Sequence, residues 1–61
     1  MTGKELLKLL KKNGWQVVRI KGSHHIMKNP SRPGAQLVVP VHTGELPAGT
    51  TESILKKANL K

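Results

Sequence analysis

The start of the chain carries apolar and basic side chains in the period of an α-helix. The apolar positions are Leu6, Leu7, Leu9 and Leu10. The basic positions are Lys4, Lys8, Lys11 and Lys12. This spacing predicts an amphipathic helix with one buried face and a lysine stripe on the other. Thr2 and Glu5 have the spacing of a capping box that begins the helix. Asn13-Gly14 ends it, because either residue tolerates the left-handed conformation common at helix termini.

Three short segments follow, and the first, over residues 15–21, is rich in β-branched residues and bounded by Gly14 and Gly22. They predict strands over residues 15–21, 24–29 and 36–41, with a Gly22-Ser23 turn between the first two. Residues 30–34, with two prolines and a glycine, mark a longer basic loop. Pro40 has no N–H for a sheet ladder, so it indicates an edge position or a strand end.

A second helix is expected after the segment 47–51. Its buried side would carry Ile54, Leu55 and Ala58. Lys56 and Lys57 would point outward, and Asn59 would form the C-terminal cap. The order is then helix, three strands, helix.

Short connections favour an antiparallel meander, and a sheet with one covered face needs both helices on that face. The sequence therefore predicts an α+β fold, a two-layer α-β-β-β-α sandwich, as a single domain over residues 1–61. Double-stranded-RNA-binding domains and several unrelated small modules share this layout, so the layout alone does not fix the function.

Charge narrows the choice of partner. Eleven Lys and Arg face three Glu, which gives a net charge of +8 on 61 residues. Such a field attracts polyanions, and nucleic acid is favoured over a merely solubilising surface or an anionic membrane. The chain has no cysteine and no apolar stretch that suggests a signal peptide or a membrane span. We therefore expect a cytoplasmic protein.

The segment K-G-S-H-H offers the most informative chemistry. Gly22 and Ser23 permit a phosphate to approach backbone N–H groups, with a lysine and an imidazole on either side. RNA cleavage by transesterification needs a proton acceptor and a proton donor, and histidine serves either role near neutral pH. Because strand residues alternate, His24 and His25 point to opposite faces. Periodicity does not decide which of them faces the helices.

The other polar and aromatic candidates favour structural roles. His24 and His25 do not readily bind one metal ion together, and no carboxylate cluster completes a shell, so no metal is expected. His42 is interpreted as structural or RNA-contacting, and Glu45 as a favourable charge near a helix N-terminus. Trp15 is expected in the core, because it is the only large side chain available to it.

Several segments, taken in order, resemble a known family. They are K-K-N-G-W at the end of the first helix, K-G-S-H-H at the turn, V-V-P-V-H-T-G-E-L-P in the connector and P-A-G-T-T-E-S-I-L-K-K-A-N-L in the last helix. In this order and spacing the chain resembles a HicA-type toxin over essentially its whole length. Asn59 stands where the family usually has glycine, which is a conservative change at a helix cap.

The resemblance implies a double-stranded-RNA-binding-domain-like fold and cleavage of messenger RNA without a metal or other cofactor. It also implies a HicB-type antitoxin from the same operon as the partner. The family's functional histidine follows the Gly-Ser pair, which puts the catalytic role on His24 and leaves His25 as a candidate helper. The residues expected to contact RNA phosphates are Lys8, Lys12, Lys21, Gly22, Ser23, Lys28 and Arg32.

Two alternatives remain beside an RNA-cleaving toxin. A non-catalytic double-stranded-RNA-binding module would typically have a lysine cluster at the start of its second helix. Residues 47–51 carry no positive charge, which counts against that alternative. A DNA-binding or assembly module is weaker still, because no recognition helix stands out.

Overall fold

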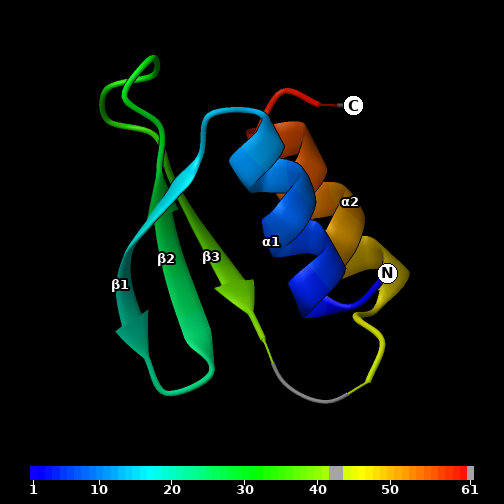
Figure 1. Ribbon diagram of the computed structural model, residues 1–61. Helices are drawn as coiled ribbons and strands as arrows, with labels where there is room; N and C mark the ends of the chain where they lie inside the picture. The colour runs from blue at the N-terminus through cyan, green and yellow to red at the C-terminus, as the bar shows by residue number, and fades with distance from the viewer. Residues whose placement is uncertain (42–43, 61) are drawn as a thin grey trace.

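A helix, a three-stranded meander and a second helix follow one another along the chain (Figure 1). The computed structural model describes residues 1–41 and 44–60. The elements are α1 (Gly3–Lys12), β1 (Gln16–Lys21), β2 (His24–Lys28), β3 (Gln36–Pro40) and α2 (Ala48–Lys57). The strands are antiparallel in the order β1-β2-β3, and both helices contact β3. The predicted α-β-β-β-α fold is confirmed.

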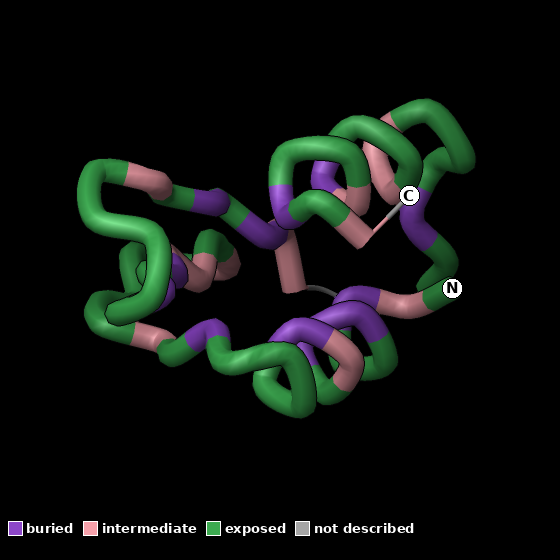
Figure 2. The backbone as a smooth tube through the Cα atoms, turned by 90° about the horizontal axis from the view of Figure 1, so that it is seen from above, coloured by how far each residue is buried: buried purple, intermediate pink, exposed green. Residues whose placement is uncertain are grey.

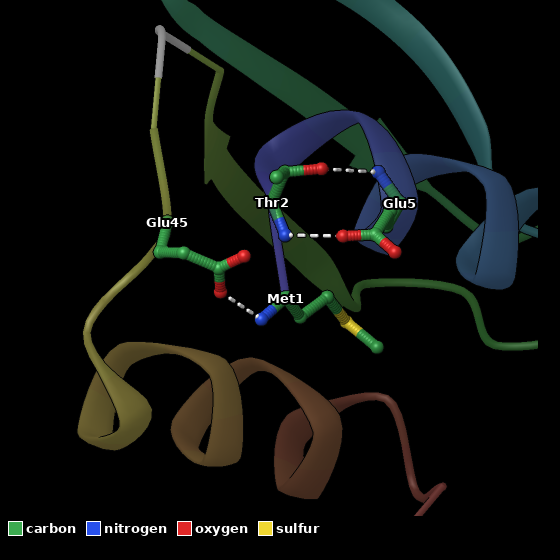
Figure 3. A network of polar contacts seen from close by, with 4 residues as sticks. All are labelled: Met1, Thr2, Glu5 and Glu45. Atoms are coloured by element: carbon green, nitrogen blue, oxygen red, sulfur yellow. Dashed lines mark hydrogen bonds and ion pairs between the residues drawn. The ribbon is translucent and has the colours of Figure 1, made fainter.

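The capping box at the start of α1 forms as its sequence predicts. The backbone N–H of Glu5 donates to Thr2 Oγ1 at 3.2 Å, and the Thr2 N–H donates to Glu5 Oε1 at 2.9 Å (Figure 3). These contacts satisfy N–H groups that have no partner inside the helix. Gly14 follows the helix with φ +91°, the left-handed conformation that its sequence position predicted.

The register of the sheet decides which side chains face the helices. In β2, Met27 lies opposite Val17 of β1 and Leu37 of β3, and His25 lies opposite Val39 of β3. Met27, Leu37 and Val39 are buried, so this face of the sheet meets the helices. The register shifts at Val18, where β1 bulges. The opposite face of the sheet is not covered by either helix.

The core lies between the two layers. Figure 2 shows the buried segments turned toward the middle of the molecule, with exposed turns and loops at its periphery. Its members are Leu6, Leu7, Leu10, Trp15, Met27, Leu37, Val39, Leu46, Ile54 and Ala58. Trp15 is 1% exposed, which confirms its predicted place in the core.

Each predicted strand is one residue too long. Trp15 precedes β1, and its N–H donates to the Leu10 carbonyl at the end of α1. Asn29 follows β2, because its side chain bonds to the Ser31 N–H and to the carbonyl of residue 13. Val41 follows β3, although its N–H still donates to the Ser23 carbonyl.

The second helix ends as predicted but begins at Ala48, inside the segment after which it was expected. Pro47 precedes α2 and makes no capping hydrogen bond through its side chain. At the other end Asn59 has φ +62°, and it is the sole described residue other than glycine with a positive φ. Asparagine tolerates this conformation, which explains how it replaces glycine after a helix.

Candidate functional site

His24 begins β2 on the face of the sheet that the helices leave open. Its neighbour His25 lies opposite the buried Val39, so the helix-covered face includes His25 and the open face includes His24. The His24 side chain is exposed, and His25 is half-buried. The question that periodicity left open is therefore decided by Met27, which is the core residue of this strand in place of Ile26.

Two strands place side chains directly beside His24 on the open face. Lys21 of β1 and Pro40 of β3 are its cross-strand partners. Side chains of directly opposed residues in an antiparallel pair have Cβ atoms about 5 Å apart. A phosphate at His24 can therefore also reach the ammonium group of Lys21. Pro40, the partner on the other side, contributes an apolar ring and has no backbone N–H.

The turn that precedes His24 is open to solvent on the side where an anion would approach. Gly22 has φ +60°, and a Cβ built on it would meet no atom within 4 Å. The glycine is thus required for its backbone conformation and not for close packing. Ser23 is half-buried, and its carbonyl accepts the Val41 N–H at 2.6 Å, which ties the turn to the end of β3.

The open face is basic and carries no acidic residue. Arg19, Lys21 and Lys28 extend the positive charge along β1 and β2. The three glutamates of the chain stand elsewhere, in α1, in α2 and in the segment before α2. Because no carboxylate competes for these cations, the open face is the part of the sheet best suited to a polyanion.

The predicted phosphate-binding residues do not all share this face. Lys21, Gly22, Ser23 and Lys28 belong to the sheet and its turn, close to or in line with His24. Lys8 and Lys12 lie on the exposed side of α1, in the other layer, beside a shallow cavity of about 370 Å³.

Arg32 occupies a third position, in the loop that follows β2. Its Nη1 donates to the Lys57 carbonyl at 3.3 Å, at the end of α2. Arginine carries five N–H donors, so this bond leaves others for an anion. The bond also fixes the loop against the helix layer. The sequence indicated the charge of Arg32 but not this anchoring contact.

Asn29 is a positioning residue that sequence reasoning did not single out. It is the buried polar residue of the described chain, and its side chain accepts from the Ser31 N–H at 2.9 Å and donates to the Asn13 carbonyl at 3.3 Å. These bonds hold residues 29–35 against the end of α1. The dipeptide Asn29-Pro30 is a turn signal that could have marked it.

One family model matches the chain, over residues 3–60. It describes the HicA toxin of bacterial toxin–antitoxin systems. The match covers nearly the whole chain, including the turn before His24 and both helices. The chain belongs to the HicA toxin family. It is thus a toxin of a toxin–antitoxin system, and an antitoxin partner is implied. No curated protein matches the chain in sequence.

Three other titratable groups of this HicA toxin make contacts near the start of α1. The Met1 ammonium group donates to Glu45 Oε2 (Figure 3). The Leu46 N–H donates to the Met1 carbonyl at 3.0 Å. This hydrogen bond to Glu45 raises the pKa of the Met1 ammonium group. The hydrogen bonds from Thr2 lower the pKa of Glu5. Glu45 therefore makes a structural contact, and its partner is the ammonium group of Met1.

The toxin's other histidines differ from His24. His25 Nδ1 is buried and has no hydrogen-bond partner in the described part of the chain. His42 lies outside the described residues. Within residues 1–41 and 44–60 no group of His, Cys, Asp and Glu could hold a metal ion, and no helix is long and apolar enough to cross a membrane.

Proposed function

We propose that this toxin is an endoribonuclease that cleaves messenger RNA without a metal ion and uses His24 as its catalytic residue. The observation that supports the proposal is the exposed imidazole of His24 beside Lys21, on a basic sheet face without carboxylates. Membership of the HicA toxin family supports a toxic activity, and the charge of +8 supports a nucleic-acid target.

The chemistry is an internal transesterification. The 2′-oxygen of a ribose attacks the adjacent phosphorus, the bond from phosphorus to the 5′-oxygen breaks, and a 2′,3′-cyclic phosphate forms. His24 takes the proton of the 2′-hydroxyl or supplies the proton of the departing 5′-oxygen, and solvent exchanges that proton afterwards. Lys21, the cross-strand partner of His24, supplies a positive charge that stabilises the extra negative charge of the phosphorane. The N–H groups at Gly22 and Ser23 bind the same phosphate.

The antitoxin is proposed to be of the HicB type and to cover the face that carries His24. An acidic surface on that partner would complement the basic strands. The cytoplasm is the proposed location, because messenger RNA is there and the chain has no cysteine that needs an oxidising compartment.

A cleavage assay in EDTA tests the proposal. Labelled single-stranded RNA is incubated with the purified wild-type chain, with His24→Ala and with His25→Ala. We expect His24→Ala to lose at least about a hundredfold in cleavage rate, because proton transfer by a side chain commonly contributes that much. Circular dichroism should show an unchanged fold, because the ring is exposed.

The other outcomes of this assay identify the alternatives. Intact RNA in every lane, together with RNA binding, would support a non-catalytic RNA-binding module. Equal cleavage by the wild type and His24→Ala would overturn the role of His24. For the antitoxin, co-expression of the small protein encoded beside this gene should suppress cleavage by the wild type. Failure to suppress it would contradict the proposed partner.

A further inference from the structure

A second hollow lies on the open face of the sheet, at the end away from His24. It has a volume of about 290 Å³ and lies between β1 and the loop that follows β2. Its walls are Gln16, Val18, Lys28, Asn29, Pro30, Arg32, Pro33, Gly34 and Ala35. The turn before His24 and this loop stand at opposite ends of β2 (Figure 1).

We propose that this hollow binds a single nucleobase of the RNA strand whose backbone passes His24. This inference rests on the proposed function in one respect, which is the number of nucleotides between the bound base and the cleaved bond. The hollow would be a binding subsite distant from the reacting phosphate. It would select which bond of the RNA is cleaved.

The chemistry of the lining fits a base. The apolar part of the lining consists of Val18, Ala35 and two prolines, and an unstacked base covers such a surface well. Val18 is 54% exposed, so its side chain is available to a ligand. Gln16 has an amide that can both donate to and accept from a base edge.

The charges around the hollow fit the backbone that carries the base. Lys28 lies between Gln16 and Gln36 on the open face, and Arg32 stands on the loop side. Single-stranded nucleic acid is commonly bound by this combination, in which apolar or aromatic surfaces hold bases and cations follow the phosphates. No glutamate lines the hollow, so the charge complementarity to RNA is unopposed.

The position of the hollow fits a strand that also reaches His24. Lys28 and His24 are both on the open face of β2, four positions apart, which is about 13 Å along the strand. Single-stranded RNA crosses that distance within a few nucleotides. The cavity is at the lower end of the roughly 300–1,000 Å³ of small-molecule pockets, so it suits one base and not a longer segment.

The loop that forms the hollow is held in place before any ligand arrives. Asn29 bonds to the Ser31 N–H and to the end of α1, the Ala35 N–H donates to the Arg32 carbonyl at 3.0 Å, and Arg32 itself bonds to the end of α2. A site formed in advance loses little conformational entropy on binding.

A titration separates base binding from attraction of phosphate. His24→Ala protein labelled with ¹⁵N is titrated with each nucleoside 5′-monophosphate and, separately, with ribose 5-phosphate, and amide shifts are followed by NMR. We expect the nucleotides to shift the amides of Val18 and Ala35, and ribose 5-phosphate to leave them unshifted. Equal shifts with both probes would overturn the proposal, because only the phosphate would then be bound.

A matched pair of variants repeats the test on the same strand. Val18→Asp places a negative charge in the lining of the hollow, whereas Ile20→Asp makes the same change at an exposed position of β1 outside it. We expect the first variant to lose the nucleotide-induced shifts and the second to keep them. Equal behaviour of the two variants would contradict a subsite at the hollow.

Cleavage of modified RNA tests how many nucleotides separate the bound base from the cleaved bond. Oligoribonucleotides with one abasic position at successive distances from the cleaved bond are compared, and we expect kcat/KM to fall about tenfold at one distance, which is the size of effect that one base contact has. In Val18→Asp that distance dependence should disappear. A uniform effect at all distances would overturn the register. A chain that cuts no RNA at all would contradict the proposed function, while the NMR titration would still decide whether the hollow binds a base.

Discussion

The α-carbon of Gly3 lies against the carbonyl oxygen of Pro40. A Cβ added to Gly3 would stand 2.7 Å from that oxygen and 3.0 Å from the Val41 Cα. Pro40 is the cross-strand partner of His24. The start of α1 is therefore packed directly onto the strand residue beside the proposed catalytic histidine, and the absence of a side chain at Gly3 allows this approach.

Gly3→Ala should lower the free energy of unfolding by about 1–3 kcal/mol, because the backbone of β3 cannot move away without repacking. Gly49→Ala is the matched control, since a Cβ there would meet no atom within 4 Å. In a helix that control should leave stability unchanged or raise it by up to about 1 kcal/mol. Urea unfolding followed by circular dichroism measures both, and equal effects would contradict the close contact.

Stability should fall in acid partly because of Glu5. Hydrogen bonds from Thr2 lower the pKa of Glu5 in the folded chain, so its contribution is present at neutral pH. That contribution is lost as the pH falls through the lowered pKa. Glu5→Gln should reduce the slope of stability against pH between about pH 5 and 3. An unchanged acid slope in this variant would show that the capping box does not form in solution.

Stability should also fall in alkali, through the other end of the same network. Glu45 raises the pKa of the Met1 ammonium group, so this contribution is present at neutral pH. It is lost as the pH rises through the raised pKa. Glu45→Gln should remove the loss of stability that this contact causes at high pH. Glu5→Gln is the control and should retain more of it, because Glu5 contributes less than Glu45 to the raised pKa of Met1.

Replacement of His25 by an apolar residue should not reduce the stability of the fold, although His25 adjoins His24 in the sequence. Its buried Nδ1 has no partner among the described residues, and an unsatisfied buried polar group costs about 1–3 kcal/mol. His25→Leu should therefore keep or raise the free energy of unfolding and retain RNA cleavage. Loss of cleavage in a stably folded His25→Leu chain would restore His25 as a catalytic helper.

Lysines on the two layers should differ in their effect on cleavage. Lys21→Ala and Lys28→Ala change the open face, whereas Lys8→Ala and Lys12→Ala make the same charge change on α1. Loss of the lysine beside His24 should lower kcat/KM about tenfold, the equivalent of one charge-assisted hydrogen bond. Lys28→Ala should reduce the salt dependence of RNA binding by about one unit of slope. Equal effects on both layers would indicate attraction by net charge alone.

The helical elements could be predicted from the sequence because their signals are local. The capping box of Thr2 and Glu5, the leucine spacing of α1 and the positive φ at Gly14 and Asn59 each depend on a few adjacent residues. The order of elements then left few ways to bury the apolar faces. One end of each strand was misplaced by one residue, because hydrogen bonds outside the sheet pattern decide where Trp15 and Asn29 belong.

The sequence by itself determined the charge of the chain, its element order and the K-G-S-H-H turn that precedes the candidate histidine. Only the tertiary structure decided that His24 and not His25 faces outward, because each carries one apolar neighbour two residues on and only packing shows that Met27 is buried. It also decided that Lys8 and Lys12 stand in the other layer and that residues 29–35 enclose a hollow. Those relationships depend on cross-strand register and on long-range packing, which adjacent residues do not specify.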